Sequence, residues 1–132
     1  MKLIEYKQFI EEEILTLYSS VGWTAYTQEP DALRRGFEHS LLILAAYEED
    51  ELIGLIRAVG DGCTIVLVQD LLVRPAHQRK GVGTALLEEV LKRFAHVRQI
   101  ELCTDQTPET LAFYRKAGFR LMTELGCCGM MR

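Results

Sequence analysis

The sequence predicts a mixed α/β fold in which a twisted central sheet of six to seven strands carries helices on both faces. Two observations carry this prediction. The chain alternates between continuously apolar or period-two segments, typical of strands, and segments whose apolar residues recur every three to four positions, typical of helices. The expected elements follow the order βααβββαβαβ, which combines consecutive strands with strand–helix–strand units and therefore favours a mixed sheet.

The size and composition of the chain indicate one soluble globular domain over residues 1–132. Its 132 residues are 48% hydrophobic, enough for a substantial core. The net charge of −4 argues against general nucleic-acid binding. No apolar run reaches the length of a membrane span, and the N-terminus lacks a secretory apolar segment. We therefore expect a cytoplasmic protein with neither a nucleic-acid nor a membrane partner.

The cysteines and histidines do not form a metal-binding pattern. None of the four cysteines belongs to a Cys-x-x-Cys pair, and adjacent cysteines such as Cys127 and Cys128 have poor spacing for zinc. The three histidines are dispersed along the chain. We expect no metal site, and we expect the thiols to stay reduced in a cytoplasm.

The first third of the chain is expected to hold one strand and two helices. The strand covers residues 2–6, and apolar residues four apart predict a helix over 7–18. Gly22 ends this pattern, and residues 23–26 are expected to form a loop. Pro30 is typical of a first helical turn and starts a second helix, which ends near residue 40.

The remaining elements follow from residue 41 onward. We expect strands over residues 41–47, 52–59, 64–73, 99–104 and 119–125, and helices over 82–94 and 109–117. Asp61-Gly62 marks the turn of a hairpin, and Pro75 ends the third of these strands because it lacks a backbone donor. That strand is expected to be buried on both faces. Residues 126–132 either add a short seventh strand or lie loose.

A basic turn with two glycines lies between the strand at 64–73 and the helix at 82–94. Glycine lets the backbone approach a ligand closely, and the first amides of a helix attract anions. We therefore predict a phosphate-binding corner. A dinucleotide-binding loop would need a third glycine in place of Leu86, and a P-loop would need Gly-Lys-Ser/Thr. The turn consists of Gln78, Arg79, Lys80, Gly81, Val82, Gly83 and Thr84.

The pattern Gln-x-x-Gly-x-Gly, between a strand and a helix, resembles the acetyl-CoA signature of the GNAT superfamily of N-acyltransferases. Val73-Arg74-Pro75 before it and Phe113-Tyr114 with Gly118-Phe119 after it extend the resemblance over residues 41–119. The resemblance implies the same element order, with the strands at 64–73 and 99–104 splayed to admit acetyl-CoA. Its pyrophosphate would lie on the turn, and its pantetheine arm would pair with Leu71, Leu72 and Val73.

The resemblance also implies a catalytic acid. Tyr114 matches the tyrosine that protonates the coenzyme A thiolate in much of the family. Thr107 stands where many members have an asparagine that contacts the pantetheine, so this cofactor contact differs here. The alternative interpretation is that Tyr114 is a core aromatic residue beside Phe113.

Two carboxylates are candidates for the general base. Asp70 precedes the segment expected to splay, and Glu101 lies on the next strand of the predicted pair. Either could draw a proton from the incoming ammonium, directly or through water. Alternatively, Asp70 pairs with a neighbouring cation, Glu101 faces solvent, and a water chain serves as the base.

The acceptor site is expected at the loop between the first two helices. Trp23 and Tyr26 lie in this loop, which the resemblance places beside the acceptor. A lone tryptophan is more often a packing residue, so packing remains the alternative for both.

The sequence as a whole predicts an N-acetyltransferase that passes acetyl from acetyl-CoA to a primary amine by direct attack in a ternary complex. No cysteine lies where a covalent intermediate would require it. A small-molecule amine is favoured as the acceptor, and the family resemblance allows a homodimer. The alternatives are acetylation of a protein N-terminus or lysine, and a non-catalytic module that binds acyl-CoA.

Overall fold

The computed structural model describes all residues from Met1 to Arg132 and divides them into two compact units, Met1–Glu101 and Leu102–Arg132. The first unit holds nearly the whole sheet and four α-helices. The second holds the last residue of the sheet, one α-helix and a short 3₁₀ helix.

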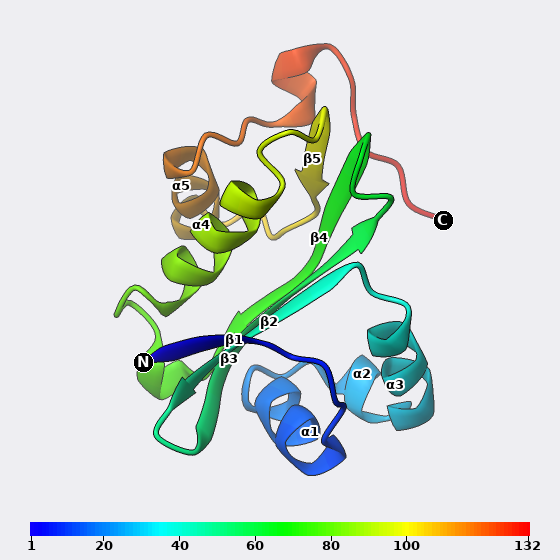
Figure 1. The fold of residues 1–132 in the computed structure, drawn as a ribbon. Coiled ribbons are helices and arrows are strands. Elements are labelled where there is room, and N and C mark those ends of the chain that lie inside the picture. Colours follow the sequence, from blue (N-terminus) through cyan, green and yellow to red (C-terminus); the bar gives the residue numbers. More distant parts are fainter. The chain divides into compact units, whose positions relative to one another are not determined.

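The sheet has five strands in the order β1-β2-β3-β4-β5. The pairs β1–β2, β2–β3 and β3–β4 are antiparallel. The amide of Gln99 donates to the carbonyl oxygen of Thr64 at 3.1 Å, so β5 begins beside the start of β4 and both run the same way (Figure 1). The sheet is therefore mixed, as predicted. The strands are β1 Lys2–Glu5, β2 Leu42–Glu48, β3 Glu51–Gly60, β4 Ile65–Val73 and β5 Gln99–Leu102.

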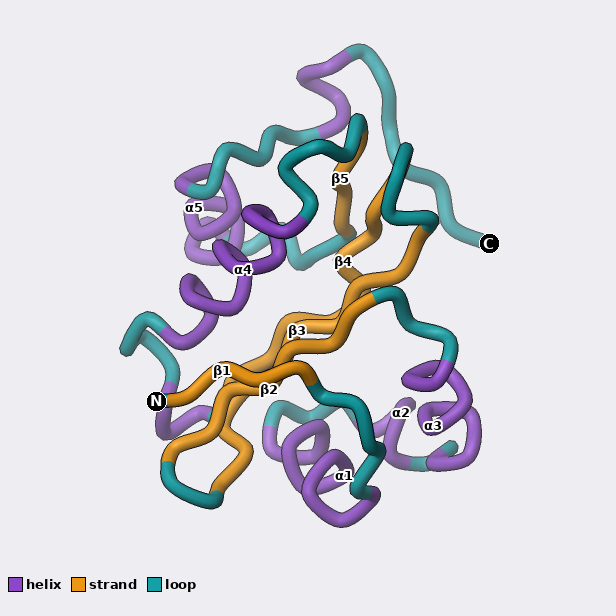
Figure 2. The backbone as a smooth tube through the Cα atoms, in the orientation of Figure 1, coloured by secondary structure: helices purple, strands orange, loops and turns teal.

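Helices cover both faces of this sheet, as Figures 1 and 2 show. Helices α1 (Glu11–Ser20), α2 (Thr24–Thr27) and α3 (Pro30–Glu38) lie on one face, and α4 (Val82–Arg93) lies on the other. A Cβ atom on Gly54 would lie 3.0 Å from Val82 Cγ1 and 3.3 Å from Leu86 Cδ1. The glycine in β3 therefore lets α4 pack close against the sheet.

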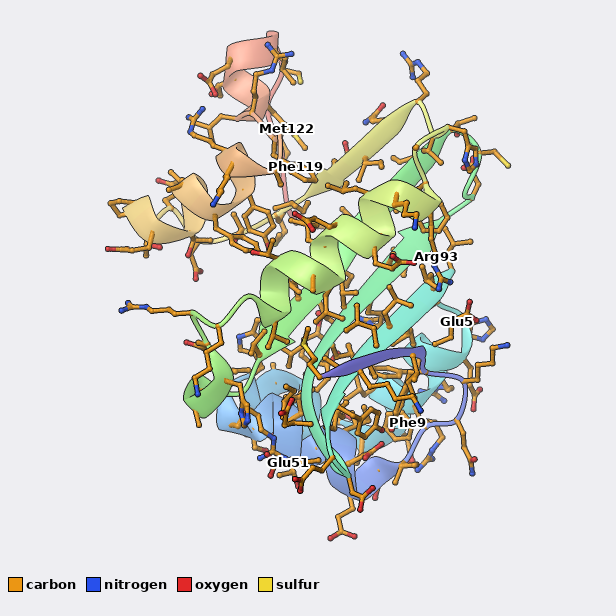
Figure 3. All side chains as sticks on the ribbon, turned by 60° about the vertical axis from the view of Figure 1, so that its left-hand side comes forward. Glu5, Phe9, Glu51, Arg93, Phe119 and Met122 are labelled. Carbon is orange, nitrogen blue, oxygen red and sulfur yellow. The ribbon has the colours of Figure 1, made fainter.

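The core under α1 and α3 is rich in aromatic contacts. Phe37 meets the edge of Phe9 at a centroid distance of 5.1 Å and that of Tyr6 at 6.2 Å. On the outer rim, Arg93 of α4 forms an ion pair with Glu5 of β1 (Figure 3). Each large apolar side chain buried in this core contributes about 1.5 to 3 kcal/mol. The fully buried members of the core include Ile14, Leu17, Tyr18 and Leu55.

A bulge in β4 changes which way its side chains point. Arg57 of β3 lies opposite Asp70, but the next residue of β3, Ala58, lies opposite Val68. Gln69 is therefore the extra residue, and a bulge of this kind re-aims the side chains that follow it. Before the bulge, Val66 packs with Ala58 in a small separate cluster; after it, Asp70 faces α1 and α2.

Two sequence predictions about the strands are wrong. The strand β4 is only partly buried, because Gln69 is exposed and the other residues between the buried Val66, Val68, Asp70 and Leu72 are half-buried. The sheet also lacks a sixth and a seventh strand. The carboxylate of Glu124 accepts hydrogen bonds from the Leu121 amide and from Arg115, both at 3.0 Å, and these stabilise a 3₁₀ helix over Met122–Leu125. Residues 126–132 form neither helix nor strand.

Two further differences concern local structure. Residues 24–27, expected as part of a loop, form the one-turn helix α2. The first helix begins at Glu11 and not at residue 7, because Tyr6 is buried and its hydroxyl accepts from the Ile10 amide at 3.2 Å. This contact holds residues 6–10 outside the helix.

Candidate functional site

The basic turn before α4 is preformed by its backbone. Gly81, the residue before the helix, has a φ of +87°, and Arg79 has a φ of +63°. These left-handed conformations turn the chain sharply, and the side-chain amide of Gln78 donates to the Val73 carbonyl at 2.9 Å to tie the turn to the end of β4. The strand, the turn and the helix therefore form one continuous corner.

This corner has the features of an anion site. The amides of Val82, Gly83 and Thr84 open α4 and have no partner within the helix. Arg79 and Lys80 are exposed at the same place. A Cβ atom on Gly81 would meet nothing within 4 Å, so the space above the turn is open. These residues fit a pyrophosphate group.

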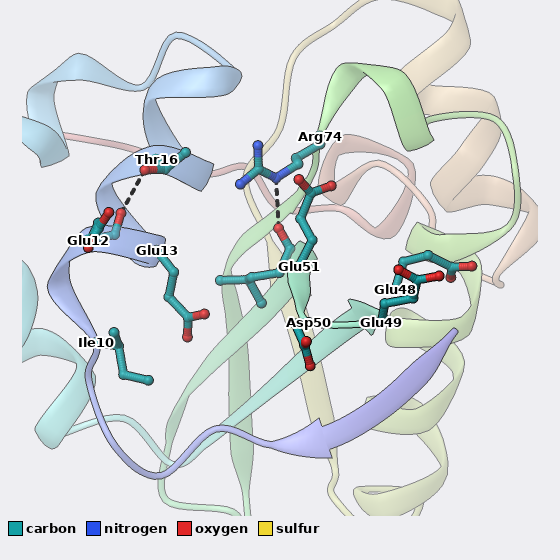
Figure 4. Close-up of a pocket in the computed structure, with 10 residues that line it drawn as sticks. Ile10, Glu12, Glu13, Thr16, Glu48, Glu49, Asp50, Glu51 and Arg74 are labelled. Atoms are coloured by element: carbon teal, nitrogen blue, oxygen red, sulfur yellow. Dashed lines mark hydrogen bonds between the residues drawn. The ribbon is translucent and has the colours of Figure 1, made fainter.

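A concave region elsewhere in the first unit has the opposite charge. A cavity of about 650 Å³ lies between the start of α1 and the β2–β3 hairpin (Figure 4). Arg74, whose Nε donates to the Leu52 carbonyl at 2.7 Å, is its one basic residue. The carboxylates of this cavity would repel a pyrophosphate, whereas the charge of the basic turn would attract one. The acidic lining residues are Glu12, Glu13, Glu48, Glu49, Asp50 and Glu51.

The end of β4 precedes the turn. Leu71, Leu72 and Val73 pair with β3, opposite Ile56, Leu55 and Gly54. The hydrogen bond between Gln99 and Thr64 lies at the other end of β4, about 23 to 30 Å away at roughly 3.3 Å per residue. The strand therefore brings these three residues to the basic turn, as the prediction of a pantetheine-binding segment requires.

The Asp70 carboxylate lies at the centre of a buried polar network. Its Oδ2 accepts from Arg57 Nε at 2.6 Å and from the Tyr18 hydroxyl at 2.9 Å, and its Oδ1 accepts from the Tyr26 hydroxyl at 2.8 Å. Asp70 is 2% exposed and Arg57 is 6% exposed. The side-chain amide of Gln69 donates to the Tyr26 hydroxyl at 3.3 Å. Arg57 is therefore the neighbouring cation that pairs with Asp70.

Burial and charge together set the protonation of this network. Burial works against the charged form of Arg57, but the adjacent Asp70 carboxylate outweighs it and raises the Arg57 pKa. Burial, then the Asp70 charge, raises the pKa of Tyr18. Burial also raises the pKa of Tyr26, although the hydrogen bond from Gln69 works in the other direction. The network therefore holds a charged arginine and two neutral phenols at neutral pH.

Arg57 and Tyr18 were not among the site residues predicted from the sequence. A signal for Arg57 was present, because it is the one charged residue within the apolar run of residues 52–59. A cation in a buried strand needs a carboxylate partner, and Asp70 is the matching charge in the next strand. Tyr18 carried no such signal, since its helical spacing indicates a core residue.

Of the other predicted site residues in the first unit, two lie beside Asp70 and one lies on β5. Trp23 and Tyr26 are both half-buried, pack with Tyr18 at centroid distances of 5.9 and 5.2 Å, and so lie beside Asp70. Glu101 is half-buried in β5 and accepts from the Gln99 side chain at 2.6 Å. Its role as a base remains a prediction, as does that of Asp70.

The second unit contains Tyr114 and Thr107. Helix α5 covers Pro108–Lys116, and Thr107 caps it by accepting from the Thr110 amide at 3.3 Å. Tyr114 meets the edges of Phe113 at 5.0 Å and Phe119 at 5.8 Å. Burial raises the Tyr114 pKa, and its hydrogen bond with Thr104 opposes this effect. Tyr114 therefore retains its proton at neutral pH.

The structure holds neither a cluster of metal-ligating side chains nor a helix suited to a membrane. No three His, Cys, Asp or Glu side chains are grouped so that they could hold a metal ion. None of the helices has both the length and the apolar character needed to cross a membrane.

Comparison with known proteins decides the family. The model of the acetyltransferase (GNAT) domain matches residues 39–121, which include β4, the basic turn, α4 and α5. The chain belongs to the GNAT acetyltransferase family. A GNAT-family acetyltransferase from Streptococcus pneumoniae TIGR4 is 37% identical, with a TM-score of 0.90, and the match covers 99% of this chain and 96% of that one.

More distant GNAT relatives carry named acceptors. An aminoglycoside acetyltransferase from an uncultured soil metagenomic sample is 27% identical, with a TM-score of 0.64 over 91% of this chain and 93% of that one. Serotonin N-acetyltransferase 2 of Oryza sativa is 31% identical over 80% of this chain and 54% of its own length. The chain spans 54 to 63% of the length of the first curated relatives that it matches.

The geometry of the turn predicts the effect of a side chain at Gly83. Gly83→Val places a branched side chain in the first turn of α4, so acetyl-CoA affinity should fall at least about tenfold while circular dichroism stays native. Titration calorimetry measures the affinity. Glu88→Val is the matched control, because it puts the same side chain on an exposed position of the same helix and should leave the affinity unchanged. Equal affinities for the two variants would contradict the placement of the pyrophosphate.

Proposed function

We propose that this GNAT protein transfers the acetyl group of acetyl-CoA to a primary amine by direct attack in a ternary complex. The observation that carries the proposal is the continuous corner of β4, the basic turn and α4, with its left-handed Gly81 and its open helix N-terminus. Family membership supports the reaction type.

The chain's residues would hold acetyl-CoA in two ways. The amides of Val82, Gly83 and Thr84, with the charges of Arg79 and Lys80, would bind the pyrophosphate. The backbone of residues 71–73 would pair with the pantetheine arm, and one of its amides would stabilise the oxyanion that forms at the thioester carbonyl. Acetyl-CoA supplies an activated acetyl group on a good leaving thiolate.

The chemistry follows from the balance of protons and bonds. The acceptor ammonium loses one proton to solvent water and becomes a neutral amine, its nitrogen bonds to the carbonyl carbon, and the carbon–sulfur bond breaks. Tyr114 would donate its phenolic proton to the sulfur, and solvent would restore it while the new amide nitrogen loses its second proton. The raised pKa of Tyr114 supports this role, because an acid must carry its proton at working pH.

A covalent acetyl-cysteine route has little support. The four cysteines are exposed and free, and none lies in β4, the basic turn or α4. Direct attack therefore remains the proposed route. Free exposed thiols are also typical of a reducing compartment, which supports the proposal of a cytoplasmic enzyme.

The acceptor side is proposed to lie at Trp23 and Tyr26. Both are half-buried aromatic residues of a short segment beside Asp70, and aromatic rings bind an amine's apolar part and its cation. A small-molecule amine is favoured; a protein lysine or N-terminus is the second acceptor class. The relatives named for aminoglycoside and serotonin acetylation define two further probes.

The first prediction of this proposal is binding followed by turnover. Acetyl-CoA should raise the melting temperature, because a ligand that binds only the native state stabilises it by mass action. Thiol release from acetyl-CoA should then increase with at least one of four probes, namely an aminoglycoside, serotonin, spermidine and a lysine-bearing peptide. Binding with no thiol release for any probe would favour a non-catalytic acyl-CoA-binding module. No thermal shift at millimolar acetyl-CoA would contradict the proposal itself.

The second prediction isolates the proposed acid. Tyr114→Phe removes one hydroxyl and keeps the ring between Phe113 and Phe119, so the fold should remain. Single-turnover rates should fall by roughly 10² to 10⁴ while the acetyl-CoA affinity stays the same. Tyr47→Phe, which removes a hydroxyl bound to Glu13 at 2.7 Å, is the matched control. A Tyr114→Phe enzyme as fast as the control would remove Tyr114 from the mechanism.

A further inference from the structure

The Asp70 carboxylate joins two segments that lie far apart in the sequence. On its own strand it follows the bulge at Gln69 and pairs with Arg57 of β3 at 2.6 Å. Its other oxygen accepts from Tyr26 of α2, 44 positions earlier in the chain, at 2.8 Å. One buried carboxylate therefore connects β4, directly before its last segment Leu71–Val73, with the helix on the proposed acceptor side.

Helix α2 depends on this connection. It is a single turn of four residues, none of which is buried, and its N-cap residue Trp23 makes no side-chain cap hydrogen bond. So short a helix is not stable by itself in water. The Tyr26 hydroxyl on Asp70 and the contacts of Tyr26 and Trp23 with the Tyr18 ring hold the segment against the sheet.

The same geometry is unfavourable for a base. Asp70 is 2% exposed, and three donors from Arg57, Tyr18 and Tyr26 already occupy its two oxygens. A base must come within hydrogen-bond reach of the proton that it removes. If Asp70 took up a proton, the buried charge of Arg57 would lose its counter-ion, which is strongly unfavourable.

We propose that Asp70 is a positioning residue, which holds the β4 bulge through Arg57 and holds the acceptor segment Trp23–Tyr26 through the Tyr26 hydroxyl. The amine then meets a fixed aromatic surface beside the strand that binds the thioester. This inference rests on the proposed function and replaces the prediction that Asp70 is the general base.

The first test uses the single tryptophan of the chain as a reporter. Tyr26→Phe removes the hydroxyl that binds Asp70, so α2 should loosen and acrylamide quenching of Trp23 fluorescence should rise about twofold. The matched control is Tyr47→Phe, whose hydroxyl also binds a carboxylate, that of Glu13, away from α2. It should leave Trp23 quenching as in the wild type.

The same variants separate positioning from chemistry in the kinetics. With the fastest of the four probe amines, Tyr26→Phe should raise the acceptor KM about tenfold while kcat and the acetyl-CoA affinity change little. Tyr47→Phe should change neither constant. If Tyr26 had only a structural role, Tyr26→Phe would lower the free energy of unfolding but would not raise the acceptor KM while leaving kcat unchanged.

The second test addresses Asp70 directly. Asp70→Asn alone leaves the Arg57 charge buried without a partner and should destabilise the fold strongly. The double variant Arg57→Gln with Asp70→Asn removes both charges and should refold and regain stability. If Asp70 is a positioning residue, the double variant should keep kcat within about tenfold of the wild type and should keep the same pH profile of kcat/KM. If Asp70 is the general base, its loss should lower kcat by roughly 10² to 10⁴.

Any of three outcomes overturns the proposal: equal Trp23 quenching in Tyr26→Phe and Tyr47→Phe, an unchanged acceptor KM in Tyr26→Phe, or a folded double variant whose kcat is lowered by roughly 10² or more. Failure of the proposed function is recognised separately, because wild-type protein would then show no acetyl-CoA binding or no thiol release. In that case the Trp23 quenching experiment still tests whether Asp70 holds α2.

Discussion

The buried ion pair between Arg57 and Asp70 is the interaction on which the arrangement of the first unit depends. Two opposite charges in an apolar interior are costly to desolvate, and they persist here because Tyr18 and Tyr26 add hydrogen bonds to the carboxylate. An apolar pair of the same size could pack equally well. The charged pair adds direction, because Arg57 donates to Asp70, which lies opposite it at the register that the bulge creates.

The bulge lies within β4, and the basic turn follows the end of this strand. Before Gln69, Val66 packs with Ala58 and Val97; after it, Asp70 faces α1 and α2. At the end of the strand, the left-handed Arg79 and Gly81 turn the chain into α4. One strand thus leads from the proposed acceptor side to the proposed pyrophosphate site, with residues 71–73 between them.

The sequence predicted those features that local patterns determine. The basic turn and α4 were found because glycines, charges and apolar spacing all occur within a few residues. The network around Asp70 could not be found in this way, since its donors come from α1, α2 and β3. Gln69 also has no local signal, because a bulge changes the facing of a strand without changing its composition.

The missing strands have a related cause. Residues 119–125 contain enough apolar residues to predict a strand, but the contacts of Glu124 with Leu121 and Arg115 stabilise a 3₁₀ turn. A local hydrogen bond, which a hydrophobic pattern does not report, determines the structure there.

The claim that Asp70 holds the acceptor segment is tested most directly by a double-mutant cycle between Tyr26→Phe and Asp70→Asn. The free energy of unfolding, measured in urea for the wild type and all three variants, gives the coupling between the two side chains. The account predicts a favourable coupling of about 1 to 2 kcal/mol, the excess of a hydrogen bond to a carboxylate, about 1.5 to 3 kcal/mol, over one to the neutral amide oxygen that the substitution leaves, about 0.5 to 1.5 kcal/mol. Additive effects of the two substitutions would contradict it.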